Sequence, residues 1–231
     1  MSVDLRVDWC NHEAAKWAVE HWHYSRRMPM PPLLKIGVWE DTEFIGCVLF
    51  ARGNTPSLGK PYGLGLLEVC ELVRVALSRH VSPVSQIVAK SIKMLKCNSP
   101  DLRLIVSFAD PAEGHNGAIY QAMNWQYTGM STPDKAYYYQ GRWQHSREIR
   151  GGAFGSSRKL SDYSHLSTRI VNGKHRYLYP LDRAMRKQIA PLRKPYPKRE
   201  TCGPSVEGDT LPQAEGGVRS TGAALVGNDN G

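Results

Sequence analysis

Hydrophobic residues in the first half of the chain follow two different periods. After Asn11, which suits a helix N-cap, apolar residues recur every three or four positions, and this spacing predicts a helix that ends near His23–Tyr24. Its predicted apolar face consists of Ala14, Trp17, Ala18, His21 and Trp22. Prolines at 29, 31 and 32 exclude a continuation of this helix. Two apolar runs follow, Leu33–Trp39 and Phe44–Phe50, and the four polar residues between them predict a β-hairpin.

The next segment, up to residue 128, alternates between strand and helix periods. Residues 66–77 predict a strand, and Ser82-Pro83 opens a predicted helix. The apolar face of this helix is Val84, Ile87, Val88, Ser91, Ile92 and Leu95. An unbroken apolar run at 102–108 is typical of a buried strand, and a short helix from His115 and a strand from Trp125 follow. This order predicts an α/β fold, a mixed sheet flanked by helices that contains a βαβ unit.

Composition restricts the partners of the chain. The net charge of +9 favours polyanions, of which nucleic acid is the commonest. No apolar run approaches the roughly 20 residues that span a bilayer, so no membrane association is expected. The first ten residues do not resemble a secretory signal, and five scattered cysteines without a C-x-x-C pair favour neither disulfides nor structural zinc. A cytoplasm-like compartment is therefore expected.

The positive charge is concentrated in one segment. Between residues 142 and 199, fifteen Lys and Arg residues outnumber three acidic ones, a net of +12, and six aromatic residues lie among them. Cations can pair with phosphates while flat rings stack on bases. Residues 142–199 are therefore predicted to be a basic, DNA-binding extension of a catalytic domain at 1–141, although a basic tail without a specific partner has a similar composition. Residues 200–231 are rich in Gly, Pro and Ser and predict a disordered tail.

Two segments carry candidate chemistry. The strand from Glu71 contains Arg74 and leads through a short loop into a helix, whose first backbone amides suit a phosphate. The second segment runs from Ser107, in a strand, to Asn116 and Tyr120 in a helix. Together they resemble the GNAT family of acyl-CoA-dependent N-acyltransferases, although Arg79-His80-Val81-Ser82-Pro83-Val84 replaces the family's glycine-containing loop. The resemblance implies that acetyl-CoA or a related acyl donor is held by Leu77, Val84, Ser85 and Asn116.

A narrower resemblance covers most of residues 1–200. The segments 23–29, 71–74, 107–110, 116–120 and 177–187 (YLYPLDRAMRK) are together similar to the Mom proteins of Mu-like bacteriophages. That family modifies adenine in phage DNA at N6 with a carbamoylmethyl group, which protects the DNA from host restriction enzymes. The resemblance implies a transferase acting on double-stranded DNA in the cytoplasm of the infected bacterium. An acetyl-CoA-dependent N-acetyltransferase for a protein or small amine, and a non-catalytic nucleic-acid-binding protein, are the alternatives.

Each predicted site residue has a role and an alternative. The predicted catalytic residues are Tyr120, Asp110, His23, Tyr24, Arg74 and Ser107. Tyr120 is expected to be a general acid, and His23 and Asp110 to be bases or, together with Tyr120, ligands of an iron-type ion. Asp110 before a proline also suits a turn or helix cap, and His23 a helix C-cap. The predicted DNA-binding residues are Arg26, Arg27, Arg147, Arg150, Arg158, Lys159, Lys174, Arg176, Arg186 and Lys187.

Overall fold

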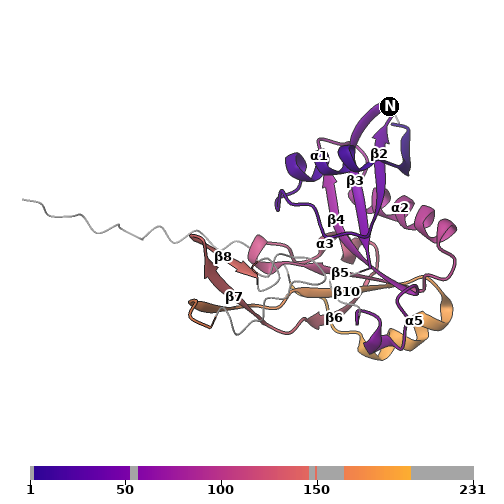
Figure 1. Ribbon diagram of the computed structural model, residues 1–231. Helices are drawn as coiled ribbons and strands as arrows, with labels where there is room; N and C mark the ends of the chain where they lie inside the picture. Colours follow the sequence, from indigo (N-terminus) through magenta and orange to yellow (C-terminus); the bar gives the residue numbers. More distant parts are fainter. Residues whose placement is uncertain (1–2, 53–56, 146–148, 150–163, 199–231) are drawn as a thin grey trace, which may run out of the picture. The chain divides into compact units, whose positions relative to one another are not determined.

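A seven-stranded mixed sheet, in the order β1-β2-β3-β4-β5-β10-β6, forms the centre of the protein (Figure 1). The structure is a computed structural model and describes residues 3–52, 57–145, 149 and 164–198. The strands are β1 (Leu5–Trp9), β2 (Leu33–Glu40), β3 (Glu43–Ala51), β4 (Val69–Leu77), β5 (Leu104–Ala109), β6 (Gln126–Met130) and β10 (His175–Pro180). Neighbouring strands are antiparallel except for β4 and β5, which are parallel. The predicted mixed sheet with its βαβ unit is confirmed.

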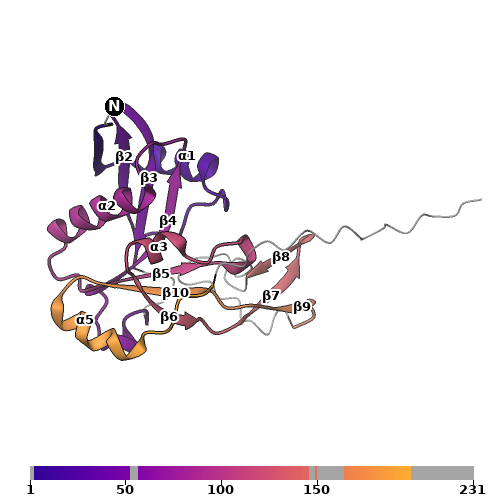
Figure 2. The same cartoon turned by 180° about the vertical axis from the view of Figure 1, so that it is seen from behind.

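Helices cover both faces of the sheet (Figure 2). The helices are α1 (His12–Trp22), α2 (Val84–Asn98), α3 (Ala118–Ala122) and α5 (Arg183–Ile189). Alternate residues of β5 belong to two different apolar clusters, with Ile105 on the α2 and α3 face and Leu104 on the α5 face. The third cluster, between α1 and strands β3 and β4, lies on the same face as α5. The predicted buried face of α2 is confirmed from Ile87 to Leu95.

The predicted apolar face of α1 is wrong by one position, although the helix and its cap are correct. Asn11 caps α1, since its Oδ1 accepts a hydrogen bond from the Ala14 amide at 2.8 Å. The residues buried against the sheet are Ala15, Ala18 and Val19. Trp17 is 47% exposed and stacks on His21 at the surface. A helix whose inner face is made of small residues can lie close to a sheet, and the large rings then remain at its margin.

The basic stretch does not form an extension separate from the sheet, which corrects the predicted boundary at residue 141. Strand β10 lies between β5 and β6 and pairs with both of them. Its residues Tyr177 and Leu178 are fully buried. Further along, the Tyr196 hydroxyl donates to the Trp125 carbonyl at 2.7 Å, so the chain stays on the sheet beyond α5. The sheet takes in β10 because strand pairing depends on these apolar residues, whatever the net charge of the segment.

Several predictions fall on residues outside the described part of the chain. Those residues are Arg147, Arg150, Arg158, Lys159 and the tail 200–231. The described residues between 3 and 198 belong to one compact unit.

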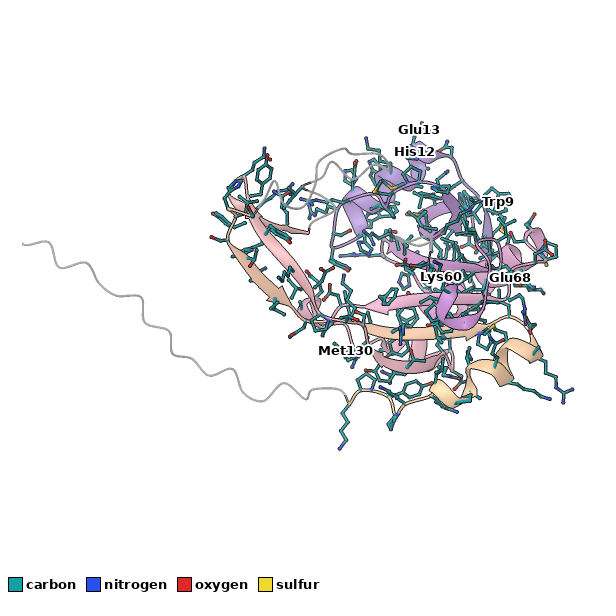
Figure 3. All side chains as sticks on the ribbon, turned by 60° about the horizontal axis from the view of Figure 1, so that its bottom comes forward. Trp9, His12, Glu13, Lys60, Glu68 and Met130 are labelled. Carbon is teal, nitrogen blue, oxygen red and sulfur yellow. The ribbon has the colours of Figure 1, made fainter. Side chains whose placement is uncertain are left out.

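A small three-stranded sheet follows β6, which ends at Met130 (labelled in Figure 3). Its strands β7 (Asp134–Tyr139), β8 (Arg142–His145) and β9 (Thr168–Val171) have the order β8-β7-β9. The rings of Tyr138 and Trp143 meet edge to face at 5.4 Å, and the Arg169 guanidinium lies 4.7 Å from the centre of the Trp143 ring. Two residues of this surface, Trp143 and Arg169, belong to the basic segment 142–199.

The described helices and cysteines bear on two expectations from the composition, one on membrane association and one on disulfides. Within the described ranges, every helix is too short or too polar to cross a membrane. Cys47 and Cys70 are buried free thiols, Cys10 is partly buried and Cys97 is exposed. Burial raises the pKa of the Cys47 thiol to about 12, so this thiol is protonated at neutral pH.

Candidate active site

The parallel strands β4 and β5 separate halfway along their length. They pair only from Val69–Leu104 to Leu72–Ser107. Beyond these pairs, β4 continues beside β3 to Leu77 and β5 continues beside β10 to Ala109. The extra residue of a bulge, Val73, lies where the separation begins. A bulge bends its strand and redirects the side chains that follow it, so the sheet is opened at the carboxyl ends of two parallel strands.

Tyr120 and Ser107 are linked by hydrogen bonds at the start of this opening. The Ser107 hydroxyl lies 2.8 Å from the Leu72 carbonyl oxygen and 2.7 Å from the Tyr120 hydroxyl. A carbonyl can only accept, so the single Ser107 proton goes to Leu72 and Tyr120 donates to Ser107. Burial raises the pKa of Tyr120 to about 12. Tyr120 is therefore a neutral phenol with a defined proton at neutral pH, the state that a general acid or hydrogen-bond donor requires.

Helix α3 positions Tyr120 through a glycine and a buried tyrosine. Gly117, immediately before the helix, has φ +79°, and a Cβ atom there would lie 2.3 Å from the Tyr177 ring. The Tyr177 ring lies 5.0 Å from the Tyr120 ring, and its hydroxyl donates to the Asn116 carbonyl. The chain around Asn116 is therefore held by β10, and Gly117 allows the close approach.

His23 lies at the end of α1 as a neutral hydrogen-bond donor. Its backbone amide donates to the Val19 carbonyl, and its ring Nδ1 accepts from the Ser25 amide at 3.1 Å. Burial, followed by the charges of Arg74 and His115, lowers the pKa of His23 to about 4. Since Nδ1 accepts, the proton of the neutral ring is on Nε2. The geometry favours an Nε2–H donor over the general base that we expected.

Tyr24 and Arg74 lie beside His23, and His115, which the sequence analysis did not single out, lies there as well. The Tyr24 ring is 4.3 Å from the His23 ring and 5.1 Å from the His115 ring, and Tyr24 remains 51% exposed. Arg74 donates from Nη1 to the Val73 carbonyl at 2.7 Å. Its buried Nε has no hydrogen-bond partner among the described residues. A buried donor without an acceptor is costly, which is typical of a group that meets a ligand.

Asp110 is engaged by groups other than Tyr120. Its Oδ1 accepts from the Ala112 amide and caps a short 3-10 helix (Pro111–Glu113), and its Oδ2 lies 2.7 Å from the Lys174 ammonium. The local geometry therefore supports the capping role. In the described ranges no three His, Cys, Asp or Glu side chains gather closely enough to hold a metal, so the predicted iron site finds no support.

The predicted DNA-binding residues are spread over both faces. Arg26 and Arg27 follow Tyr24 after one intervening residue, Ser25, and are exposed. The Arg176 Nε donates to the Thr128 hydroxyl at 2.9 Å, and Lys174 pairs with Asp110. Arg186 and Lys187 belong to α5, which covers the face of the sheet opposite to α3. Of the described residues in this set, Arg26 and Arg27 are the neighbours of the candidate active site along the chain.

The predicted donor-binding residues lie around the loop between β4 and α2. Leu77 ends β4, and Val84 and Ser85 begin α2 after Pro83. In the loop between them, the Val81 and Ser82 amides donate to the carboxylate of Glu40. Asn116 contributes its carbonyl, which also accepts from the Gln121 side chain at 3.0 Å. Two amides of the loop ahead of α2 are therefore already bonded within the protein.

Comparison with known proteins identifies the family. The model of the Mom protein family matches residues 4–198. The chain belongs to the Mom family. The methylcarbamoylase Mom of Escherichia phage Mu is 26% identical to it over 209 residues, which cover 85% of each chain.

The Mom match extends over all the elements of the candidate site. Its limits agree with the compact unit of residues 1–198, so β10 and the basic stretch belong to the Mom region together with β4 and β5.

Among solved structures, the N-acyl amino acid synthase FeeM from uncultured soil microbes aligns over 81% of this chain and 95% of its own, with 10% identity and a TM-score of 0.46. A candidate acetyltransferase of Acinetobacter baylyi ADP1 aligns over 78% and 94%, with 11% identity and a TM-score of 0.44.

Proposed function

We propose that this Mom family chain is a transferase that attaches a carbamoylmethyl group to the N6 amine of adenine in double-stranded DNA. The modification protects phage DNA from host restriction enzymes in the cytoplasm of the infected bacterium. The observation that carries the proposal is the convergence of Tyr120, Ser107, His23 and Arg74 where β4 and β5 separate. The name of the similar Mu protein, methylcarbamoylase, supports transfer of a small group that contains a carbamoyl unit.

The protonation states of these side chains suggest their roles. A carbamoylmethyl group carries an amide carbonyl, which only accepts hydrogen bonds. The Nε2–H of His23 and the Nε–H of Arg74, which has no partner among the described residues, are suitable donors for this carbonyl. Tyr120 retains its proton at neutral pH and can donate it to a leaving group. The site thus supplies three donors for a polar group and for the negative charge that develops on it.

The exposed residues beside the opening suit the nucleic acid. An adenine amine inside a duplex cannot be reached without extruding the base. Tyr24, half-exposed between His23 and His115, offers a ring on which the extruded base can stack. Arg26 and Arg27 follow it in the chain and can pair with the phosphates on either side.

Mass spectrometry of nucleosides tests the proposal. The protein is expressed in a bacterium, the DNA is digested, and deoxyadenosine carrying a carbamoylmethyl group is measured. We expect Tyr120→Phe to reduce the product about 10²–10⁴-fold, the range for loss of a general acid, with DNA binding retained. Tyr179→Phe is the matched control, because its ring packs on Trp125 and lies outside the donor set.

The alternative functions predict different results in the same experiment. An N-acetyltransferase would leave deoxyadenosine unmodified and acetylate a protein or small amine. A non-catalytic DNA-binding protein would give no product with the unchanged chain. Unmodified deoxyadenosine from cells that contain folded protein would therefore contradict the proposal.

A further inference from the structure

The loop between β4 and α2 is the place where the acyltransferase resemblance implies a pyrophosphate. In that arrangement, backbone amides ahead of a helix surround the phosphates of an acyl-coenzyme A. Here a carboxylate of the same chain already occupies two of the amides ahead of α2. Val81 donates to both oxygens of Glu40, at 3.1 and 2.9 Å, and the Ser82 amide donates to Oε1 at 2.6 Å.

Glu40 is fixed in this place by the sheet. It is the last residue of β2, an inner strand, where it pairs with Leu5 of β1 and with Glu43 of β3. The residue is only 8% exposed. Swinging its side chain away would leave the Val81 and Ser82 amides without their acceptor.

Glu40 is also charged at neutral pH. Burial by itself raises the pKa of a carboxyl group, but hydrogen bonds from the Ser82 hydroxyl and from the Val81 and Ser82 amides outweigh burial and lower the pKa of Glu40. A phosphate arriving at this loop would find two amides engaged and a negative charge beside them. Like charges in a partly desolvated site repel strongly.

We infer that the Glu40 carboxylate prevents pyrophosphate from binding to this loop. The donor of the transferred group is therefore not held here as a coenzyme A thioester. The loop instead ties β2 to the start of α2. Recognition of the donor then depends on its small reactive part, in the opening between β4 and β5, without a contribution from a nucleotide. This inference rests on the proposed function only in assuming that a group is transferred, and the identity of the acceptor does not affect it.

Titration of the unchanged full-length protein provides the first test. Acetyl-coenzyme A and acetyl-pantetheine, which lacks the pyrophosphate and nucleotide, are compared by calorimetry, and the Val81 and Ser82 amides are followed by NMR. We expect the two compounds to differ less than about threefold in affinity, and the two amide signals to stay in place with acetyl-coenzyme A or inorganic pyrophosphate. A preference of tenfold or more for acetyl-coenzyme A, with both amide signals shifting, overturns the inference.

Variants of Glu40 provide the second test. Glu40→Ala frees both amides and removes the charge, so we expect inorganic pyrophosphate to shift the Val81 and Ser82 signals in this variant. Glu43→Ala, an exposed acid of the same hairpin, is the matched control and should behave as the unchanged protein. If Glu40→Ala is folded and its Val81 and Ser82 signals do not shift with pyrophosphate, the carboxylate is not what prevents pyrophosphate from binding.

Hydrogen exchange covers the case in which Glu40→Ala does not fold. The Val81 and Ser82 amides of the unchanged protein should exchange slowly, and Glu40→Gln, which keeps an acceptor oxygen but loses the charge, should speed their exchange at least tenfold. Fast exchange in the unchanged protein contradicts the bonding on which the inference depends. Modified deoxyadenosine is measured separately, so the adenine proposal and this inference can fail independently.

Discussion

Substituting Gly117 by alanine tests whether the close approach of α3 to β10 holds the site together. Gly117 has φ +79°, and an added Cβ would lie 2.3 to 2.6 Å from three atoms of Tyr177. The Tyr177 ring cannot yield easily, because it is fully buried and lies 5.0 and 5.2 Å from the rings of Tyr120 and Tyr127. Either the ring or the start of α3 has to move.

The expected destabilisation has three parts. A residue with a Cβ in the left-handed region costs about 1 kcal/mol. Forcing a methyl group into a filled core costs about 1–3 kcal/mol. Moving Tyr177 also breaks the bond from its hydroxyl to the Asn116 carbonyl, which contributes about 1 kcal/mol. We therefore expect Gly117→Ala to lower the free energy of unfolding by about 3–5 kcal/mol.

Gly114→Ala is the matched control, because Gly114 has φ +70° but nothing lies within 4 Å of its added Cβ. This variant should lose only the backbone contribution of about 1 kcal/mol. Urea unfolding followed by tryptophan fluorescence measures both variants, provided that the m values agree. Equal destabilisation of the two variants would show that Tyr177 does not restrict the start of α3, and would refute the account of how Tyr120 is positioned.

Three further predictions concern the site. Ser107→Ala removes the acceptor of the Tyr120 proton, and we expect a loss of about 1–3 kcal/mol in urea unfolding together with reduced modification. The pKa of His23 is about 4 in the folded chain and 6.5 as its ordinary value. Between these pH values the unfolded chain therefore binds more protons than the folded chain. The free energy of unfolding should fall by up to roughly 3 kcal/mol from pH 7 to pH 4, and His23→Gln should reduce this fall. Replacing Arg26 and Arg27 by alanine should lower the slope of log binding constant against log salt concentration by the equivalent of about two phosphate contacts. An unchanged slope would show that these two residues do not belong to the predicted DNA-binding set.

The hydrophobic period predicted the buried face of a helix correctly where the helix lies on the sheet along its length. The face of α2 follows the helical period from Ile87 to Leu95, because the helix lies on the sheet along its length. The face of α1 could not be placed from the same rule, because hydrophobicity favours Trp17 while close packing favours Ala15 and Ala18. β10 was missed because its basic surroundings concealed Tyr177 and Leu178, and strand pairing over such a sequence separation leaves no local pattern.

The residues of the candidate site could not be grouped from local sequence patterns either. His23, Arg74, Ser107 and Tyr120 come from four elements, and their selection depended on a family resemblance, since no spacing in the chain brings them together. Asp110 was placed with them because it follows a buried strand, but its carboxylate caps a short 3-10 helix and pairs with Lys174. The contact of Glu40 with Ser82 joins residues 42 positions apart and has no counterpart in a motif.

The position of β10 bears on how the protein is made. During synthesis, β5 and β6 leave the ribosome before β10, which ends at residue 180. Until then, the edges of β5 and β6 that pair with β10 remain unpaired. A chain that ends before β10 would lack the strand that pairs with both β5 and β6. We therefore expect that a nonsense mutation upstream of β10 does not yield a folded enzyme that merely lacks the basic segment.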